Sequence, residues 1–430
     1  MKYFGSSGIR GLTNEKITPD LALKVGKAVG KEYKDIVIAR DPRPSGQMLG
    51  SALISGAASM GASITRIGIL PTPTLAYAAR NFDCGIMVTA SHNPAPYNGI
   101  KLWNPDGSSF NTPQMERIER AIDGDPDLAP WDKVGTVHEN PNAVREHMDL
   151  LLDKMGTDHT LKVVIDCANG AGCVETPFLL REMGCEVIAL NSNPNGFFPA
   201  HDPEPTEKNL ADLGRTVKNT GADLGIAHDG DADRLVAFDK NGNYLGGDIL
   251  LALFASQYNE KIAVPINSSM VLEDIVDEVI RTRVGDVYVA EKLKEERAQF
   301  GGEPSGTWIF PEISYAPDAV YGASLLVKMF EELDIEERIA DLPSYPTKRG
   351  AFKTQKKEET MRKLEEKFRK DYDETRLNFI DGIRVEYQDG WVLIRKSGTE
   401  PKIRITAEAK DEKSLDKIFK ENETILKEEI

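Results

Sequence analysis

Three stretches of the chain repeat one order of elements, and this repeat restricts the fold more than any other feature of the sequence. In each stretch an apolar run typical of a buried strand precedes a polar turn, a helix-like segment and a second apolar run. The first strands are expected at residues 35–39, 162–166 and 261–264, and the second strands at residues 85–88, 224–227 and 287–290. Units of this kind build α/β layers, whose chemistry usually lies in loops beyond the strand ends.

The last part of the chain has a different pattern. Residues 356–372 and 412–428 are helix-like, and between them lie three strand-like runs at residues 382–387, 391–395 and 403–407, the first two joined by a hairpin turn. We therefore predict three related α/β domains and a smaller C-terminal α+β domain, with boundaries near residues 145, 247 and 345. A length of 430 residues agrees with several domains.

The net charge restricts the kind of partner, and the cysteine content indicates the compartment. The net charge of -16 argues against nucleic acid, and an anionic ligand would need a locally basic pocket. Cys84, Cys167, Cys173 and Cys185 form no Cys-x-x-Cys motif, so we expect buried free thiols in a reducing cytoplasm. The first residues contain no signal-peptide-like apolar run, and no run has the length of a membrane span. We therefore expect a cytoplasmic protein with no membrane partner.

Three aspartates at alternate positions follow the strand-like run at residues 224–227. Asp229, Asp231 and Asp233 offer hard oxygen ligands suited to Mg²⁺. The rival interpretation is an EF-hand loop, which needs glycine at its sixth place and glutamate at its twelfth; this chain has Arg234 and Lys240 there. The loop is therefore predicted to bind magnesium.

A serine follows the corresponding run at residues 85–88. Ser91 lies in Thr89 to Pro94, and no Gly-x-Ser-x-Gly elbow of a hydrolase occurs in the chain. A seryl phosphate and a carboxylate cage can share one divalent cation, which outlines a phosphoryl-transfer site. Arg10 and Lys101 are candidate cations for the equatorial phosphate oxygens.

Two further loops carry polar side chains of the right kind. Arg395 to Pro401 combines a guanidinium, an ammonium, two hydroxyls and a glycine, a set that suits phosphate. Gly301 to Thr307 combines a glutamate with a serine, which suits sugar hydroxyls, although a plain turn is equally consistent. Residues 40–46 are interpreted as the start of a helix with Ser45 as N-cap.

These loops occur in the order found in the α-D-phosphohexomutase superfamily, which the whole chain resembles. The opening Phe4 to Gly11 also resembles the first motif of that family, with Ser6 where threonine is more usual. The resemblance implies four domains around a central cleft: a phosphoserine domain (1–145), a metal-binding domain (146–247), a sugar-recognition domain (248–345) and a phosphate-binding domain (346–430).

The resemblance also implies site residues. Ser91 would carry a phosphate and ligate one Mg²⁺ together with Asp229, Asp231 and Asp233. Substrate contacts would come from the sugar loop (residues 301–307), the phosphate loop (residues 395–401) and their neighbours. These contacts are Arg234, Glu303, Ser305, Thr307, Arg395, Ser397, Gly398, Thr399 and Arg404. Many relatives have histidine where this chain has Thr307, so proton handling would fall to Lys101, His92, Arg10 or a substrate phosphate, and Lys101 is preferred.

The implied reaction moves phosphate between the 1- and 6-positions of a hexose phosphate through phosphoserine and a sugar 1,6-bisphosphate, which serves as intermediate and activator. Glucosamine phosphate is the first expectation for the sugar; mannose and glucose phosphates are a near-equal second, and pentose phosphates stay open. Two other classes remain: a Mg²⁺-dependent phosphatase with an aspartyl nucleophile, and a sugar-phosphate-binding protein without turnover. The expected partner is a small phosphosugar, and a homodimer is a further expectation.

Overall fold

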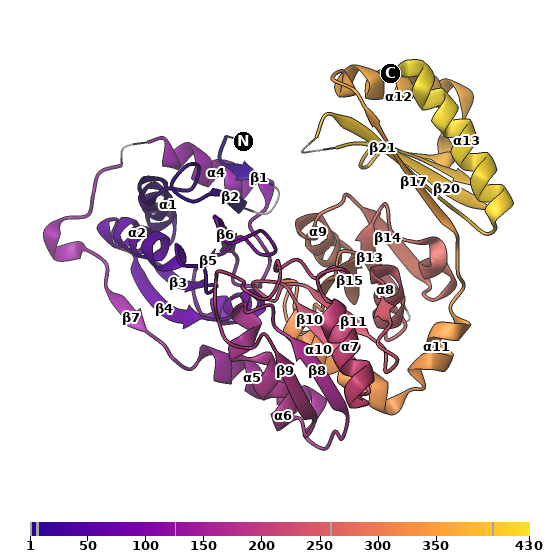
Figure 1. Ribbon diagram of the computed structural model, residues 1–430. Helices are drawn as coiled ribbons and strands as arrows, with labels where there is room; N and C mark the ends of the chain where they lie inside the picture. Colours follow the sequence, from indigo (N-terminus) through magenta and orange to yellow (C-terminus); the bar gives the residue numbers. More distant parts are fainter. Residues whose placement is uncertain (1, 6–7, 125, 259, 398–399) are drawn as a thin grey trace.

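The computed structural model describes residues 2–5, 8–124, 126–258, 260–397 and 400–430, and these form four sheets (Figure 1). The first sheet has the order β1-β2-β6-β5-β3-β4-β7. Its strands are β1 (Phe4–Gly5), β2 (Gly8–Leu12), β3 (Asp35–Arg40), β4 (Ser63–Ile69), β5 (Cys84–Val88), β6 (Tyr97–Trp103) and β7 (Val137–Glu139). The helices of this part are α1 (Pro19–Glu32), α2 (Gly46–Ser59), α3 (Thr72–Ala78) and α4 (Thr112–Ile122).

The second and third sheets are smaller. The second, in the order β12-β11-β10-β8-β9, contains β8 (Lys162–Asp166), β9 (Glu186–Leu190), β10 (Leu224–His228), β11 (Leu235–Phe238) and β12 (Tyr244–Leu245). The third, in the order β14-β13-β15-β16, contains β13 (Lys261–Pro265), β14 (Glu278–Thr282), β15 (Phe300–Glu303) and β16 (Thr307–Ile309). Their helices are α5 (Ala143–Met155), α6 (Thr176–Glu182), α7 (Ala211–Thr220), α8 (Gly247–Ala255), α9 (Asp286–Glu296), α10 (Ala319–Glu332) and α11 (Ile335–Asp341).

The fourth sheet is antiparallel, in the order β17-β21-β20-β19-β18. It contains β17 (Thr347–Lys353), β18 (Leu377–Asn378), β19 (Ile383–Tyr387), β20 (Gly390–Lys396) and β21 (Lys402–Ala409), with helices α12 (Lys357–Asp371) and α13 (Glu412–Glu429). The four sheets confirm the predicted fold class. The domain boundaries stay predictions, and "first" to "fourth domain" below means the part of the chain that contains the corresponding sheet.

The first three sheets share one core, which places the functional loops. In each, three parallel strands lie in the order third-first-second: β5-β3-β4, β10-β8-β9 and β15-β13-β14. The third strand then pairs with an antiparallel strand, which is β6, β11 or β16. Residues 89–96, 229–234 and 304–306 therefore occupy equivalent positions between the third strand and its antiparallel neighbour.

Two expectations about these units are wrong. The strands at residues 84–88 and 224–228 are the third of their cores, because β4 and β9 intervene. The strand expected at residues 287–290 belongs to helix α9, and the third strand of that unit is β15. Val287 and Val289 alternate like strand residues, but Ala290 and Leu293 continue an apolar face at helical spacing, which packs against Ala263.

The second and third domains are joined more closely than the others. One hydrophobic core runs through both, for example from Val163 and Leu224 to Trp308 and Leu326. The first and fourth domains have separate main cores. The fourth domain contacts the third through a small cluster of Ile266, Trp391 and Leu393, and in Figure 1 it stands apart from the first domain. No helix of the described residues combines the length and apolarity needed to cross a membrane.

Candidate functional site

The loop between β5 and β6 presents Ser91 in an unusual backbone conformation. Ser91 has a φ of 51°, a region that non-glycine residues rarely adopt, and the residue is 2% exposed. Its N–H donates to the hydroxyl of Thr89 at 2.9 Å, and that hydroxyl donates to the carboxylate of Asp41 at 2.7 Å. The strand end and the buried carboxylate thus fix the direction in which the serine side chain leaves the loop.

A fully buried arginine holds the same loop from behind. An arginine side chain has five N–H donors, and in Arg43 all five are used. One donates to the carboxylate of Asp41 at 2.8 Å, and four donate to backbone carbonyls of the loop and of the first residue of β6. These carbonyls belong to Ser91, Asn93, Pro94 and Tyr97, at 2.6 to 3.0 Å. The aromatic ring of Phe198, from the second domain, lies over the guanidinium at 4.8 Å.

Ser45 takes the expected N-cap position before α2, but its side chain makes no capping hydrogen bond and its backbone angles are helical. Its oxygen instead accepts from the amide of Asn98 at 2.8 Å, so the residue ties the start of α2 to β6.

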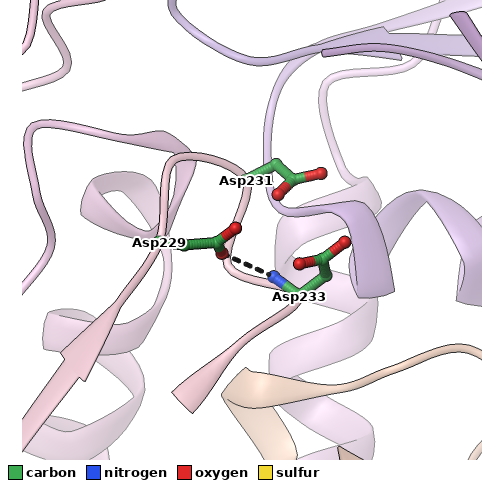
Figure 2. A group of neighbouring side chains, drawn as sticks. All are labelled: Asp229, Asp231 and Asp233. Atoms are coloured by element: carbon green, nitrogen blue, oxygen red, sulfur yellow. Dashed lines mark hydrogen bonds between the residues drawn. The ribbon is translucent and has the colours of Figure 1, made fainter. Parts of the chain in front are cut away.

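The three aspartates lie on the loop between β10 and β11, directly beside Ser91. The hydroxyl of Ser91 donates to Asp229 at 2.6 Å and lies 3.4 Å from Asp233. One oxygen from each aspartate lies within 4.8 Å of the others, and Figure 2 shows the carboxylates turned toward a common space. The turn is closed by the N–H of Asp233, which donates to Asp229 at 3.2 Å (Figure 2). Thr72 of α3 donates from its hydroxyl to Asp231 at 2.6 Å.

Nearby cations balance only part of the negative charge of the three aspartates. Burial raises the pKa of Asp229, and the carboxylates of Asp233 and Asp231 raise it further. Burial also acts on Asp233, but Lys101 and Arg234 outweigh it and lower the pKa of that carboxyl. One oxygen of Asp231 is buried with no hydrogen-bond partner among the described residues. Three carboxylates that each offer a hard oxygen ligand, one of them an oxygen without a hydrogen-bond partner, fit a divalent cation such as Mg²⁺.

The predicted cationic and imidazole groups lie around the cluster. The ammonium of Lys101 lies 3.1 Å from Asp231 and 2.7 Å from Asp233, and these carboxylates raise the pKa of Lys101 although burial acts to lower it. Arg10 donates to the side chain of Asn93 at 2.9 Å, within the serine loop. The imidazole of His92 lies 3.3 Å from the Ser91 hydroxyl, and burial, with nearby Arg234 and Arg10, lowers its pKa to about 3.

The loop between β15 and β16 meets the aspartate loop through the backbone. Arg234 and Thr307 form a β-bridge, and the N–H of Leu235 donates to the carbonyl of Gly306 at 2.8 Å. Glu303 accepts from the N–H of Gly285 at 2.8 Å, and burial, together with the carboxylate of Asp286, raises the pKa of Glu303 to about 7. The loop is thus held at a fixed position relative to the aspartates.

A cavity of about 790 Å³ separates the third and fourth domains. Ser305 and Pro304 line one wall, and Arg395, Ser397 and Arg404 line the other. Arg395 forms an ion pair with Asp381 at 2.6 Å, and Asp381 also accepts from the N–H of Val284 at 3.0 Å. Gly398 and Thr399 of the predicted phosphate loop, like Ser6, lie outside the described residues.

The predicted residues therefore form two groups. Ser91, the three aspartates, Lys101, His92, Arg10 and Arg234 are gathered around one point, and Ser305, Arg395, Ser397 and Arg404 line the cavity. Glu303 and Thr307 lie at the two ends of the loop between β15 and β16, outside the cavity lining. Sequence reasoning missed Arg43, Asp286, Asn267 and Arg349, the last two of which line the cavity. Arg43 lies in residues 40–46, which are interpreted only as the start of a helix, and Arg349 belongs to no motif. Asp286 was overlooked because residues 287–290 were predicted as a strand, whereas Asp286 is the first residue of helix α9.

Comparison with known proteins identifies the family. Models of the phosphoglucomutase/phosphomannomutase family match in order: alpha/beta/alpha domain I at residues 1–127, domain II at 139–242, domain III at 242–345 and the C-terminal domain at 349–425. The chain belongs to this family. It is an α-D-phosphohexomutase, an isomerase that transfers phosphate within a phosphosugar.

Relatives extend over the whole chain. A protein of Methanosarcina acetivorans named probable phosphoglucosamine mutase is 52% identical, over 100% of this chain and 99% of its own length. A protein of Pyrococcus horikoshii with the same name is 41% identical, over 99% and 98%. A solved phosphoglucomutase/phosphomannomutase family protein of Burkholderia thailandensis is 28% identical and has a TM-score of 0.89, over 99% of this chain and 96% of its own.

The fold is also shared with more distant enzymes. The N-acetylphosphoglucosamine mutase of Aspergillus fumigatus, solved with GlcNAc-6P and magnesium, has a TM-score of 0.59 at 14% identity, over 99% of this chain and 96% of its own. At this identity the likeness concerns the fold alone.

Proposed function

We propose that this phosphohexomutase is a phosphoglucosamine mutase, which interconverts glucosamine 6-phosphate and glucosamine 1-phosphate. The observation that carries phosphoryl transfer is the contact of 2.6 Å between the Ser91 hydroxyl and Asp229 within a buried group of three aspartates. The choice of glucosamine rests on full-length relatives at 40% to 52% identity that bear this name. A combined phosphomannomutase/phosphoglucomutase and a phosphopentomutase are the alternatives for the sugar.

Ser91 is the proposed carrier of the phosphate, and Asp229, Asp231 and Asp233 the proposed ligands of one Mg²⁺. The unpartnered oxygen of Asp231 supports this assignment, because a buried carboxylate oxygen normally has a partner. When bound, the cation would offset the negative charge of the aspartates and of the seryl phosphate. The 2.6 Å contact to Asp229 means that the unmodified hydroxyl already points at the ligand group.

The proposed transfer exchanges one phosphorus–oxygen bond for another. The bond from phosphorus to the Ser91 oxygen breaks while a bond forms to the free hydroxyl of the sugar monophosphate. The hydroxyl proton passes to a base, and the departing Ser91 oxygen takes up a proton and becomes a hydroxyl again. The resulting 1,6-bisphosphate then presents its other phosphate, which returns to Ser91 with the reverse movement of a proton. The bisphosphate is therefore both intermediate and activator, and water must be kept out while it turns.

Lys101 is the proposed proton-handling residue in place of the histidine that many relatives have where this chain has Thr307. Its ammonium is 2.7 Å from Asp233, close to the serine hydroxyl that Asp233 also approaches, and because its pKa is raised it would act as the donor of a proton to the departing serine oxygen. His92 and Arg10 lie near the same point and are the alternatives. Replacement of Lys101 by alanine tests the assignment, and turnover close to that of the parent enzyme would contradict it.

Glu303 and Ser305 are the proposed contacts to sugar hydroxyls, and Arg395, Ser397, Gly398, Thr399 and Arg404 the proposed contacts to the phosphate that does not react. Arg234 and Thr307 lie where the aspartate loop and the sugar loop meet. Because the phosphate contacts lie on a separate domain, we expect that domain to close over the ligand. Small-angle scattering that shows no compaction with a bound sugar phosphate would contradict closure.

An initial-rate panel tests the function. Glucosamine, mannose, glucose and ribose phosphates are compared with Mg²⁺ and a catalytic amount of the matching sugar bisphosphate. We expect glucosamine phosphate to give the highest kcat/KM. Release of inorganic phosphate with phosphate found on an aspartate would instead support the phosphatase class, and tight binding without turnover or phosphoserine would support a binding protein.

A cytoplasmic location and a homodimer are part of the proposal. The free edge of β7 and the neighbouring Trp131, which is 89% exposed, support self-association through the first domain. Light scattering on the purified protein gives the mass that decides this point.

A further inference from the structure

Three arginines share one face of the fourth sheet. Arg395 of β20 lies directly opposite Arg404 of β21, and Arg404 lies opposite Ala351 of β17. Side chains two residues apart on a strand point to the same face, so Arg349 of β17 continues this row. The nearest cross-strand neighbours on such a face are about 5 Å apart and diagonal ones about 7–8 Å. The row therefore spans the width of three strands.

The row faces a space large enough for a ligand. All three arginines line the cavity of about 790 Å³, whose opposite wall includes Ser305, Asn267 and Asp248 of the third domain. A pocket of this volume is in the range that holds a whole small-molecule ligand and not only a phosphate group. Arg349 is exposed, so its guanidinium is accessible to a ligand.

The three arginines differ in how their charges are balanced. Arg395 pairs with Asp381 at 2.6 Å, and Arg404 pairs with Glu400 at 3.2 Å. Among the described residues, no carboxylate lies within 4.0 Å of Arg349. The charge of Arg349 acts on the carboxylate of Asp248 in the same cavity without forming an ion pair, so its guanidinium can still take an anion as a direct partner.

We propose that Arg349 is a further phosphate-binding residue, which holds one phosphate of the sugar bisphosphate while the ligand exchanges its two ends. This inference rests on the proposed function. The 6-phosphate is joined to the ring through an additional methylene group and the 1-phosphate is not, so the distant phosphate lies at two depths in the two orientations. Arg349 is a third guanidinium in the same cavity, beside Arg395 and Arg404, and it provides a contact for the orientation of the ligand that these two do not reach.

Binding of glucose 1,6-bisphosphate tests the contact directly. Isothermal titration is carried out in a Ser91→Ala background, in which no phosphate can transfer to the serine. Because a charge-assisted hydrogen bond is lost, we expect Arg349→Gln to weaken binding on the order of ten-fold and Arg349→Lys to weaken it less. Arg349→Gln that binds like its Ser91→Ala parent would overturn the inference.

Lys348→Gln is the matched control. It removes the same charge from the adjacent position of β17, but Lys348 points to the other face and its ammonium lies 2.6 Å from Asp416 of α13. We expect it to bind as its parent does. An equal loss in both variants would mean that only the net charge of the domain matters, and the inference would fall.

Retention of the intermediate is the second measurement. Enzyme labelled with radioactive phosphate on Ser91 is mixed with unlabelled sugar monophosphate, and the labelled bisphosphate that escapes is compared with labelled product. We expect Arg349→Gln to increase escape several-fold, in keeping with the loss of one charged contact. An escape equal to that of the parent would overturn the inference but leave the mutase function intact, whereas a parent enzyme without turnover would contradict the function and leave the titration to decide about Arg349.

Discussion

Arg43 donates a hydrogen bond of 2.8 Å to the backbone carbonyl of Ser91. The remaining donors of the same guanidinium bind Asp41 and three more backbone carbonyls, so hydrogen bonds fix the backbone of the segment that contains the proposed nucleophile. The positive φ of Ser91 costs conformational energy, on the order of 1–3 kcal/mol, which the clamp offsets. The loop is thus preorganised before substrate or cation arrives.

Replacing Arg43 by lysine should reduce kcat much more than it raises KM. An ammonium cannot reach four separate carbonyls and a carboxylate, so the serine hydroxyl loses its fixed direction toward Asp229. We expect kcat to fall at least about ten-fold, since a small misplacement of a reacting group can cost about a hundred-fold, and the buried charge pair with Asp41 to weaken. Arg66→Lys, at an exposed ion pair with Glu139, is the control. A rise in KM with unchanged kcat would count against a positioning role.

Replacing Asp231 by asparagine should weaken Mg²⁺ binding. The change keeps the shape of the side chain, but it replaces one charged oxygen of the three-aspartate group by a neutral one. We expect the Mg²⁺ affinity to fall on the order of ten-fold or more, as seen generally when groups at metal sites are altered, while the Tm without metal changes little or rises because like charges are removed. Asp212→Asn, at an exposed site, is the control. Calorimetric titration with Mg²⁺ gives the affinities, and equal values would rule out Asp231 as a ligand.

The parts that could be predicted from sequence are those that local patterns encode. Asp229, Asp231 and Asp233 occupy alternate positions in one loop, and Ser91 follows a completely apolar strand, so chemistry and position were both visible. The strand at residues 287–290 was wrong because a short apolar run fits two periods, and only Leu293 extends the helical one. Arg43 and Arg349 depend on contacts with segments distant in sequence, and such contacts leave no local pattern.

A buried ionic junction between the second and third domains should make the stability of the protein fall at alkaline pH. His147 of α5 lies 2.6 Å from Glu175 and 3.5 Å from Asp318, with no side chain more than 1% exposed. Burial acts to lower the pKa of His147, but the two carboxylates raise it to about 10. Because this pKa lies above the value of about 6.5 for an unfolded histidine, its contribution is fully present below pH 6.5 and is lost as the pH rises through 10.

His147→Gln is the variant that isolates this effect. It leaves Glu175 and Asp318 without a buried cation, so we expect a loss of about 3–5 kcal/mol at pH 6.5. Thermal unfolding of parent and variant is then followed from pH 6 to pH 10.5. The difference in Tm should shrink with rising pH, because only the parent loses its charged histidine. A constant difference would mean that His147 stabilises the junction without its charge.

The carboxyl group of Glu303 should give substrate binding a pH dependence near neutrality. Burial and the neighbouring Asp286 raise its pKa to about 7, although the N–H of Gly285, Arg234 and Ser305 act in the opposite direction. The ionised carboxylate accepts hydrogen bonds from sugar hydroxyls, and the protonated form has less accepting capacity. We therefore expect KM for the sugar phosphate to rise as the pH falls from 8 to 6, with a midpoint near the pKa of about 7.

Glu303→Gln separates this titration from that of the substrate, whose phosphate also changes charge, with a second pKa of about 6. Both enzymes use the same substrate, so the ratio of their KM values reports the side chain alone. That ratio should be largest at pH 8 and approach one at pH 6, because the protonated acid and the amide are similar in charge. Folding stability should increase as substrate binding weakens. Because the carboxyl pKa is raised in the folded state, the parent gains stability relative to the variant as the pH falls from 7 toward 4.5. A KM ratio that is constant from pH 6 to pH 8 would place the Glu303 pKa outside this window and remove the proposed link between protonation and sugar binding.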